Sequence, residues 1–82
     1  MIITLQPVSG TPKENLSRAR AEIERVLNFR GSVTSAKAKG NRIMIEFEVN
    51  PKWDLPMAEK VELVKEWIPA KVKTIFKVVI VE

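Results

Sequence analysis

Two carboxylates, Glu46 and Glu48, stand two residues apart in an alternating stretch and are the best candidates for acid–base chemistry in this sequence. Residues two apart on a strand share one face, which is the placement that a catalytic carboxylate pair requires. Such a pair also needs a shifted pKa, and a solvent-facing pair with Lys37 on the diagonal offers little desolvation. We therefore interpret both glutamates as members of surface ion pairs.

A second candidate is a phosphate-binding loop, Ser9-Gly10-Thr11-Pro12-Lys13, placed just before a helix. A helix N-terminus presents unpaired amide donors to an anion. Here Pro12 lacks an amide hydrogen, Thr11 and Glu14 occupy other donors, and the Glu14 charge repels an anion. The P-loop pattern is also absent, so we expect a helix cap at this point.

The composition excludes several other chemistries, because the chain contains no cysteine, no histidine and no tyrosine. Disulfides, thiolate catalysis and cysteine-ligated metals are ruled out, and isolated carboxylates without histidine form no metal constellation. We expect a protein that is not an enzyme, with no cofactor, no metal and no small-molecule substrate.

The charge balance permits a polyanionic partner without requiring one. Fourteen Lys and Arg residues against ten Asp and Glu give a formal net charge of +4. The acidic residues are almost all Glu, and this enrichment in Glu and Lys is typical of hyperthermophile proteins. Such proteins carry many lysines for general reasons, so charge alone does not identify a nucleic-acid binder.

A hairpin over residues 33–49 is the strongest structural signal, because two alternating runs flank Gly40-Asn41. A two-residue turn there sets Lys39 opposite Arg42 and fixes the remaining pairs. The side facing the core is expected to carry Thr34, Ala36, Ala38, Ile43, Ile45, Phe47 and Val49. The other side is expected to carry Ser35, Lys37, Lys39, Arg42, Met44, Glu46 and Glu48.

The other elements follow from local signals. Residues 1–6 form a short strand closed by a proline, and the Thr11–Glu14 capping box begins a helix that Gly31 ends. Asp54 is expected to cap a second helix, which ends near Trp67 before a proline. β-Branched residues over 71–81 predict a last strand.

The resulting order, βαββαβ, resembles the ferredoxin-like split βαβ arrangement over the whole chain, 1–82, as a single domain. The resemblance implies an α+β two-layer sandwich: an antiparallel four-stranded sheet in the order 4-1-3-2, with two helices on one face. This superfold hosts many functions.

The sequence has neither a membrane-spanning apolar run nor a signal peptide at its start, so we expect a cytoplasmic location and no membrane partner.

That arrangement would gather cations towards one end of the uncovered sheet face. They are Lys37, Lys39, Arg42, Lys71, Lys73 and Lys77. The functional interpretation is contact with a DNA or RNA backbone, where each cation adds affinity through counterion release. The alternative is that edge-strand lysines only prevent aggregation and keep the protein soluble.

Two families that share this strand order limit the function further. Proteins that resemble the RNA-recognition motif place aromatic side chains on the open face, where this chain has residues such as Thr4 and Met44. Acylphosphatases resemble the topology too, but they need an arginine in the first loop and an asparagine on strand three. Here the loop offers Lys13, and Asn41 belongs to the turn. Contact with the nucleic-acid backbone is therefore the one mode of nucleic-acid binding that we expect.

An apolar corner is expected at the opposite end of the same face, made of Ile2, Ile75, Val79 and Val81. An exposed apolar edge strand invites pairing, which favours a homodimer through the C-terminal strand. A frayed, solvated end is the alternative, as is docking of a different protein.

The sequence allows two interpretations for each of the two tryptophans. Trp53 is expected to pack against Ala58 before the second helix, with stacking on a nucleic-acid base as the alternative. Leu63 and Trp67 are expected to form the contact between the two helices, with a groove for a partner as the alternative.

Overall fold

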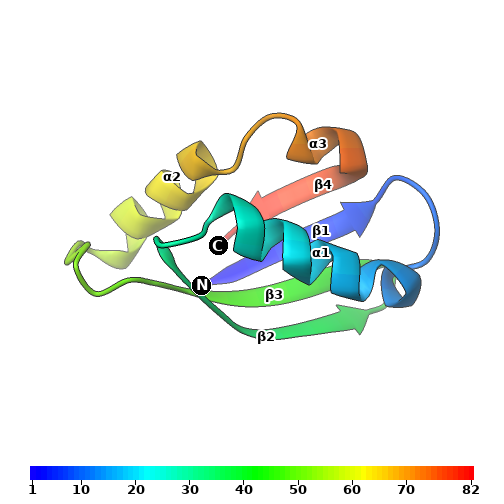
Figure 1. The fold of residues 1–82 in the computed structure, drawn as a ribbon, viewed down its shortest axis with the longest axis horizontal. Coiled ribbons are helices and arrows are strands. Elements are labelled where there is room, and N and C mark those ends of the chain that lie inside the picture. Colours follow the sequence, from blue (N-terminus) through cyan, green and yellow to red (C-terminus); the bar gives the residue numbers. More distant parts are fainter.

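The computed structural model describes residues 1–82, which form four strands and three helices (Figure 1). The strands are β1 (Ile2–Pro7), β2 (Gly31–Lys39), β3 (Arg42–Val49) and β4 (Phe76–Val81). The helices are α1 (Pro12–Val26), α2 (Met57–Trp67) and the short α3 (Val72–Ile75). The chain is therefore an α+β protein, as its sequence predicts.

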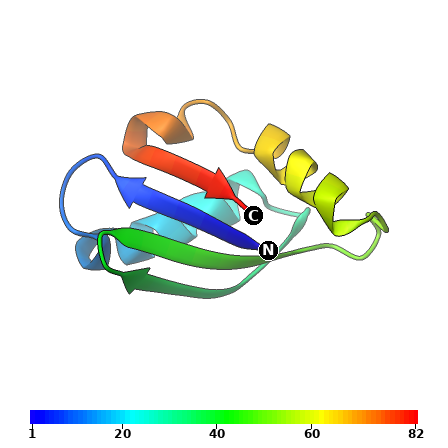
Figure 2. The same cartoon turned by 180° about the vertical axis from the view of Figure 1, so that it is seen from behind.

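The strands form one open sheet in the order β2-β3-β1-β4, and all neighbours are antiparallel. This order confirms the predicted 4-1-3-2 arrangement. Helix α1 lies across one face of the sheet, and α2 lies near the end of the sheet where both chain termini are found (Figure 1). In the reverse view no helix crosses the other face, which we call the open face (Figure 2).

The core lies between the sheet and the helices, and it is built from alternate residues of the strands. β1 contributes Ile3 and Leu5, which are fully buried. The other buried apolar residues are Ala19, Ile23, Leu27, Ile43, Ile45, Phe47, Val49, Val64, Ile68, Val72, Phe76 and Val81. No polar or charged side chain is buried, so apolar side chains alone pack the helices against the sheet.

Helix α1 begins where the capping box predicts. The Thr11 hydroxyl accepts a hydrogen bond from the Glu14 amide (3.1 Å), and the Glu14 carboxylate accepts one from the Thr11 amide (3.4 Å). The predicted end at Gly31 is wrong, because the helix ends at Val26 and Gly31 is the first residue of β2.

The hairpin keeps its predicted register from the turn to the pair Ser35↔Glu46. Gly40 has φ 62° and Asn41 has no positive φ, which is the pattern of a type II′ turn. Beyond Ser35 the prediction is wrong by one residue, because a bulge leaves Thr34 unpaired and sets Val33 opposite Phe47. Thr34 is therefore exposed, and its hydroxyl donates to the Glu46 carbonyl (3.4 Å).

The predicted strand over residues 71–81 is also wrong in its first half. Residues 72–75 form α3, because one helical turn brings Val72, Ile75 and Phe76 together against the core. A strand would have pointed Ile75 away from the other two.

A register shift in β4 then reverses the predicted faces of the last strand. Phe76 lies opposite Pro7, whereas Val78 lies opposite Gln6, so one residue of β4 is extra at this point. After the bulge, Val79 and Val81 pair with Leu5 and Ile3 on the core side.

Helix α2 begins later than expected. Its N-cap is Pro56, which makes no side-chain cap, so the predicted cap by Asp54 is wrong. Met57 is 59% exposed, and the helix contributes Val64 to the core, with Ile68 just beyond its end.

The space around Gly31 generates a stability prediction. A Cβ atom there would lie 2.2 Å from the Glu48 carbonyl oxygen and 2.6 Å from the Phe47 ring. We expect Gly31→Ala to lower the free energy of unfolding by about 3 kcal/mol or more, because backbone on the neighbouring strand must move. The measurement is urea unfolding.

Gly40→Ala is the matched control, since Gly40 has a positive φ and open space around it. We expect it to cost only about 1–2 kcal/mol, from backbone strain alone. Equal losses for the two variants would contradict the close approach of β2 and β3 at Gly31.

Candidate functional site on the open sheet face

The open face takes every second residue of each strand. The side chains between them, such as Ile3, Leu5, Ile43 and Ile45, are buried on the opposite side. By this alternation and the strand pairing, the open face carries Ile2, Thr4, Gln6, Ser32, Ser35, Lys37, Lys39, Arg42, Met44, Glu46, Glu48, Val78 and Ile80.

The cationic corner is the group Lys37, Lys39 and Arg42, at the turn end of β2 and β3. Lys39 lies directly opposite Arg42, and Lys37 lies opposite Met44, two residues further along. All three cations are exposed, and none takes part in an ion pair of the chain. Like charges directly opposite one another repel, so this corner favours an anionic partner.

Of the remaining predicted cations, Lys71 and Lys73 lie outside the sheet and do not join this corner. Lys71 precedes α3 on the helix side of the molecule, beside α1. There the hydrogen bond from Arg25 is the main cause that lowers the pKa of Glu22, and the charge of Lys71 lowers it further. Lys73 borders a groove along β4 together with Lys65. Lys77 is exposed at the start of β4.

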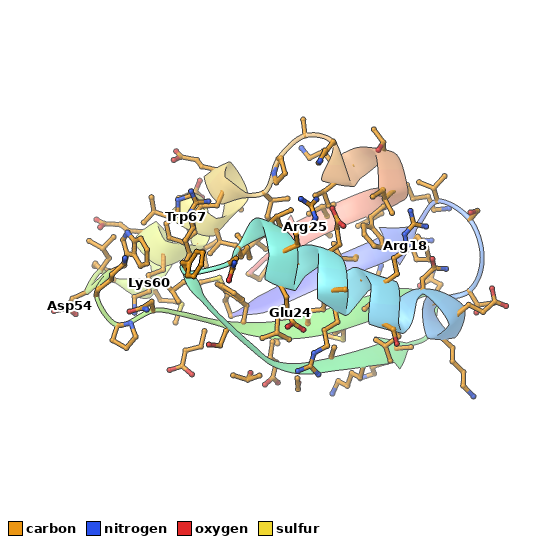
Figure 3. All side chains as sticks on the ribbon, viewed as in Figure 1. Arg18, Glu24, Arg25, Asp54, Lys60 and Trp67 are labelled. Atoms are coloured by element: carbon orange, nitrogen blue, oxygen red, sulfur yellow. The ribbon has the colours of Figure 1, made fainter.

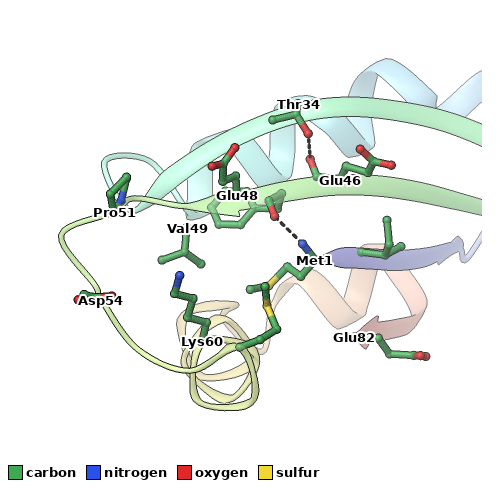
Figure 4. Close-up of a pocket in the computed structure, with 12 residues that line it drawn as sticks. Met1, Thr34, Glu46, Glu48, Val49, Pro51, Asp54, Lys60 and Glu82 are labelled. Carbon is green, nitrogen blue, oxygen red and sulfur yellow. Dashed lines mark hydrogen bonds between the residues drawn. The ribbon is translucent and has the colours of Figure 1, made fainter.

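The carboxylates of the open face lie at the other end of β3. Glu46 is opposite Ser35 on one side and Ile2 on the other. Glu46 and Glu48 border a groove of about 640 Å³ that also reaches Asp54 and Lys60 (Figure 4). No group of three or more potential acidic, histidine or cysteine ligands is close enough to hold a metal ion.

An apolar strip made of Ile2, Met44, Val78 and Ile80 runs obliquely across the open face, from Ile2 opposite Glu46 to Val78 opposite Gln6 at the turn end of the sheet. These side chains are half-buried and come from β1, β3 and β4. Of the predicted apolar corner, only Ile2 lies here. Val79 and Val81 face the core, Val81 being only 5% exposed, and Ile75 packs against the core from α3.

The two edges of the sheet differ in how open they are to another strand. Along β4, Lys65, Ile68 and Lys73 border a groove together with Val79 and Val81. Along β2, the bulge at Thr34 and the exposed lysines interrupt a flat edge, which is a common protection of edge strands.

The tryptophans pack against each other. The ring centroids of Trp53 and Trp67 are 5.0 Å apart at an interplanar angle of 64°, and Trp67 is the last residue of α2 (Figure 3). Arg30 lies 5.0 Å from the centre of the Trp67 ring, and Lys52 lies 4.4 Å from that of Trp53. This cluster ties α2 to the loops before β2 and after β3.

The Trp53–Trp67 pair and the Arg30–Trp67 contact are interactions that the sequence does not predict. The expected contact of Trp53 with Ala58 and the expected contact of Trp67 with α1 stay predictions. Leu63 borders a shallow groove on the outer side of α2. No sequence signal predicts the Trp53–Trp67 pair, because the two residues are fourteen positions apart and share no periodic pattern.

None of the helices combines the length and the apolar character that crossing a bilayer requires.

Comparison with known proteins gives no guide to function, since no family model, no curated protein and no solved structure matches the chain significantly. The geometry of the open face is therefore the basis for a functional assignment.

Proposed function

We propose that this chain is a non-enzymatic cytoplasmic binding protein that contacts the backbone of DNA or RNA through its open face. We further propose that it is a single domain with a variant of the ferredoxin-like two-layer sandwich. The strand order and the position of α1 across one face support that fold.

The observation that carries the nucleic-acid proposal is the cationic corner. Lys37, Lys39 and Arg42 lie together on the open face, without a carboxylate partner in the chain. Phosphate groups relieve the repulsion among these cations and release counterions on binding. The open face has no aromatic side chain on which a base could stack, so binding is independent of sequence.

The test is the salt dependence of binding to a fluorescently labelled 20-base-pair DNA duplex, with a single-stranded RNA of equal length as a second ligand. If the three cations each contact a phosphate, log K falls with log salt at a slope of about −2.7, a loss of about fortyfold between about 50 and 200 mM. We expect Lys39→Glu to reduce the steepness of the slope by about 1.

Lys73→Glu is the matched control, since it makes the same charge change at a lysine outside the cationic corner. It is expected to leave the slope almost unchanged. The proposal fails if binding shows no salt dependence, or if Lys73→Glu weakens binding as much as Lys39→Glu does.

Homodimerisation is a second candidate, favoured by the apolar strip. Val78 and Ile80 of the C-terminal strand lie on the open face with Ile2 and Met44, and no helix crosses that face (Figure 2). Apolar side chains grouped on an uncovered face lose contact with water when a second copy binds, which stabilises a symmetric dimer.

This candidate predicts a solution mass of twice the 9.3 kDa chain, measured by light scattering at increasing concentration. Ile80→Lys is expected to give the monomer mass, because it places a charge inside the apolar strip. Val8→Lys, at an exposed residue in the loop after β1, is the control and is expected to leave the dimer intact. A wild-type monomer at millimolar concentration would exclude homodimerisation.

A further inference from the structure

We infer that the open face is self-complementary, and that a second copy of the chain covers it with its strands antiparallel to those of the first. In this arrangement Arg42 of each copy meets Glu46 of the other. The inference rests on the second candidate function, homodimerisation, and adds the orientation of the copies and the contacts that fix it.

The pairing of the strands arranges the open face in rows that run across the sheet. The middle row contains one residue from each strand in the order Lys37, Met44, Thr4 and Ile80. On β3, Arg42 precedes this row by two residues and Glu46 follows it by two. Opposite charges therefore lie at equal distances of about 7 Å on either side of Met44.

Two copies can be related by a twofold axis that lies between their open faces and runs parallel to the middle row. Rotation about this axis places Met44 of one copy over Met44 of the other, and Ile80 over Ile80. These contacts bury the centre of the apolar strip. The same rotation reverses β3, so each Arg42 lies over Glu46 of the second copy, and two equivalent ion pairs form. The contact is isologous, as in most symmetric dimers.

The other aligned orientation, with the axis parallel to the strands, is unfavourable. It places β2 over β4 of the second copy and β3 over β1, so Arg42 faces Gln6 and Glu46 faces Ile2. Neither Arg42 nor Glu46 would then gain a charged partner when it loses water. Charge complementarity therefore selects the antiparallel orientation.

The geometry suits the packing of one sheet on another. Sheets packed face to face lie about 10 Å apart with strands rotated by about 30°, a gap that facing long side chains such as Arg42 and Glu46 fill. Lys37 would face its own counterpart, but it lies on the edge strand β2, where its long side chain can bend towards water.

The test is a charge exchange at the two paired positions. Arg42→Glu alone and Glu46→Arg alone each bring like charges together, so we expect each to weaken the dimer at least about tenfold in sedimentation equilibrium. The double variant Arg42→Glu/Glu46→Arg restores opposite charges and is expected to return the dissociation constant to within about threefold of the wild-type value.

Two controls make the result specific. Arg20→Glu, on the exposed side of α1, makes the same charge change as Arg42→Glu and is expected to leave the dimer unchanged. Circular dichroism during heating shows that each variant is folded before its mass is interpreted.

The variants also separate this inference from the functions proposed above. Glu46→Arg adds a cation to the open face, so it is expected to tighten DNA binding while it weakens the dimer. A wild-type dimer whose double variant is not restored would overturn the orientation and leave homodimerisation standing. A monomeric wild type would overturn homodimerisation and the orientation together, and the nucleic-acid proposal would be judged separately by its salt dependence.

Discussion

The pairing of β1 with a neighbour on each side is the interaction on which the rest of the structure depends. β1 lies inside the sheet, and its residues Ile3 and Leu5 are fully buried. Its register with β3 and β4 decides which side chains of those strands enter the core and which stand on the open face. The rows of charge and apolar surface on that face follow directly from this register.

The sequence predicts the parts of the fold that depend on local signals. The capping box at Thr11, the turn at Gly40 and the strand order all agree with the structure, because each rests on turn chemistry or on clear alternation. Within the strands, the errors begin at the two bulges. One extra residue reverses every side chain beyond it, and the run Val78-Val79-Ile80-Val81 is apolar on both faces, so its pattern cannot reveal such a reversal.

The same errors changed the predicted site. Lys37, Lys39 and Arg42 lie on the open face as predicted because they flank the turn, whereas Lys71 and Lys73 lie outside the last strand, before and within α3. The open face is therefore less basic than the sequence implied, with its cations balanced by Glu46 and Glu48 at the other end of β3. Arg42 is shared by both proposed interactions, so a polyanion and a second copy would compete for it.

Cross-linking at Met44 tests the self-complementary open face most directly. The chain has no cysteine, so Met44→Cys supplies a single thiol in the middle row, beside the expected twofold axis. At a concentration where the chain is dimeric, a short bismaleimide is expected to link Met44→Cys into a covalent dimer and to leave Ser17→Cys, on the exposed side of α1, monomeric. Equal yields for the two variants would contradict the arrangement.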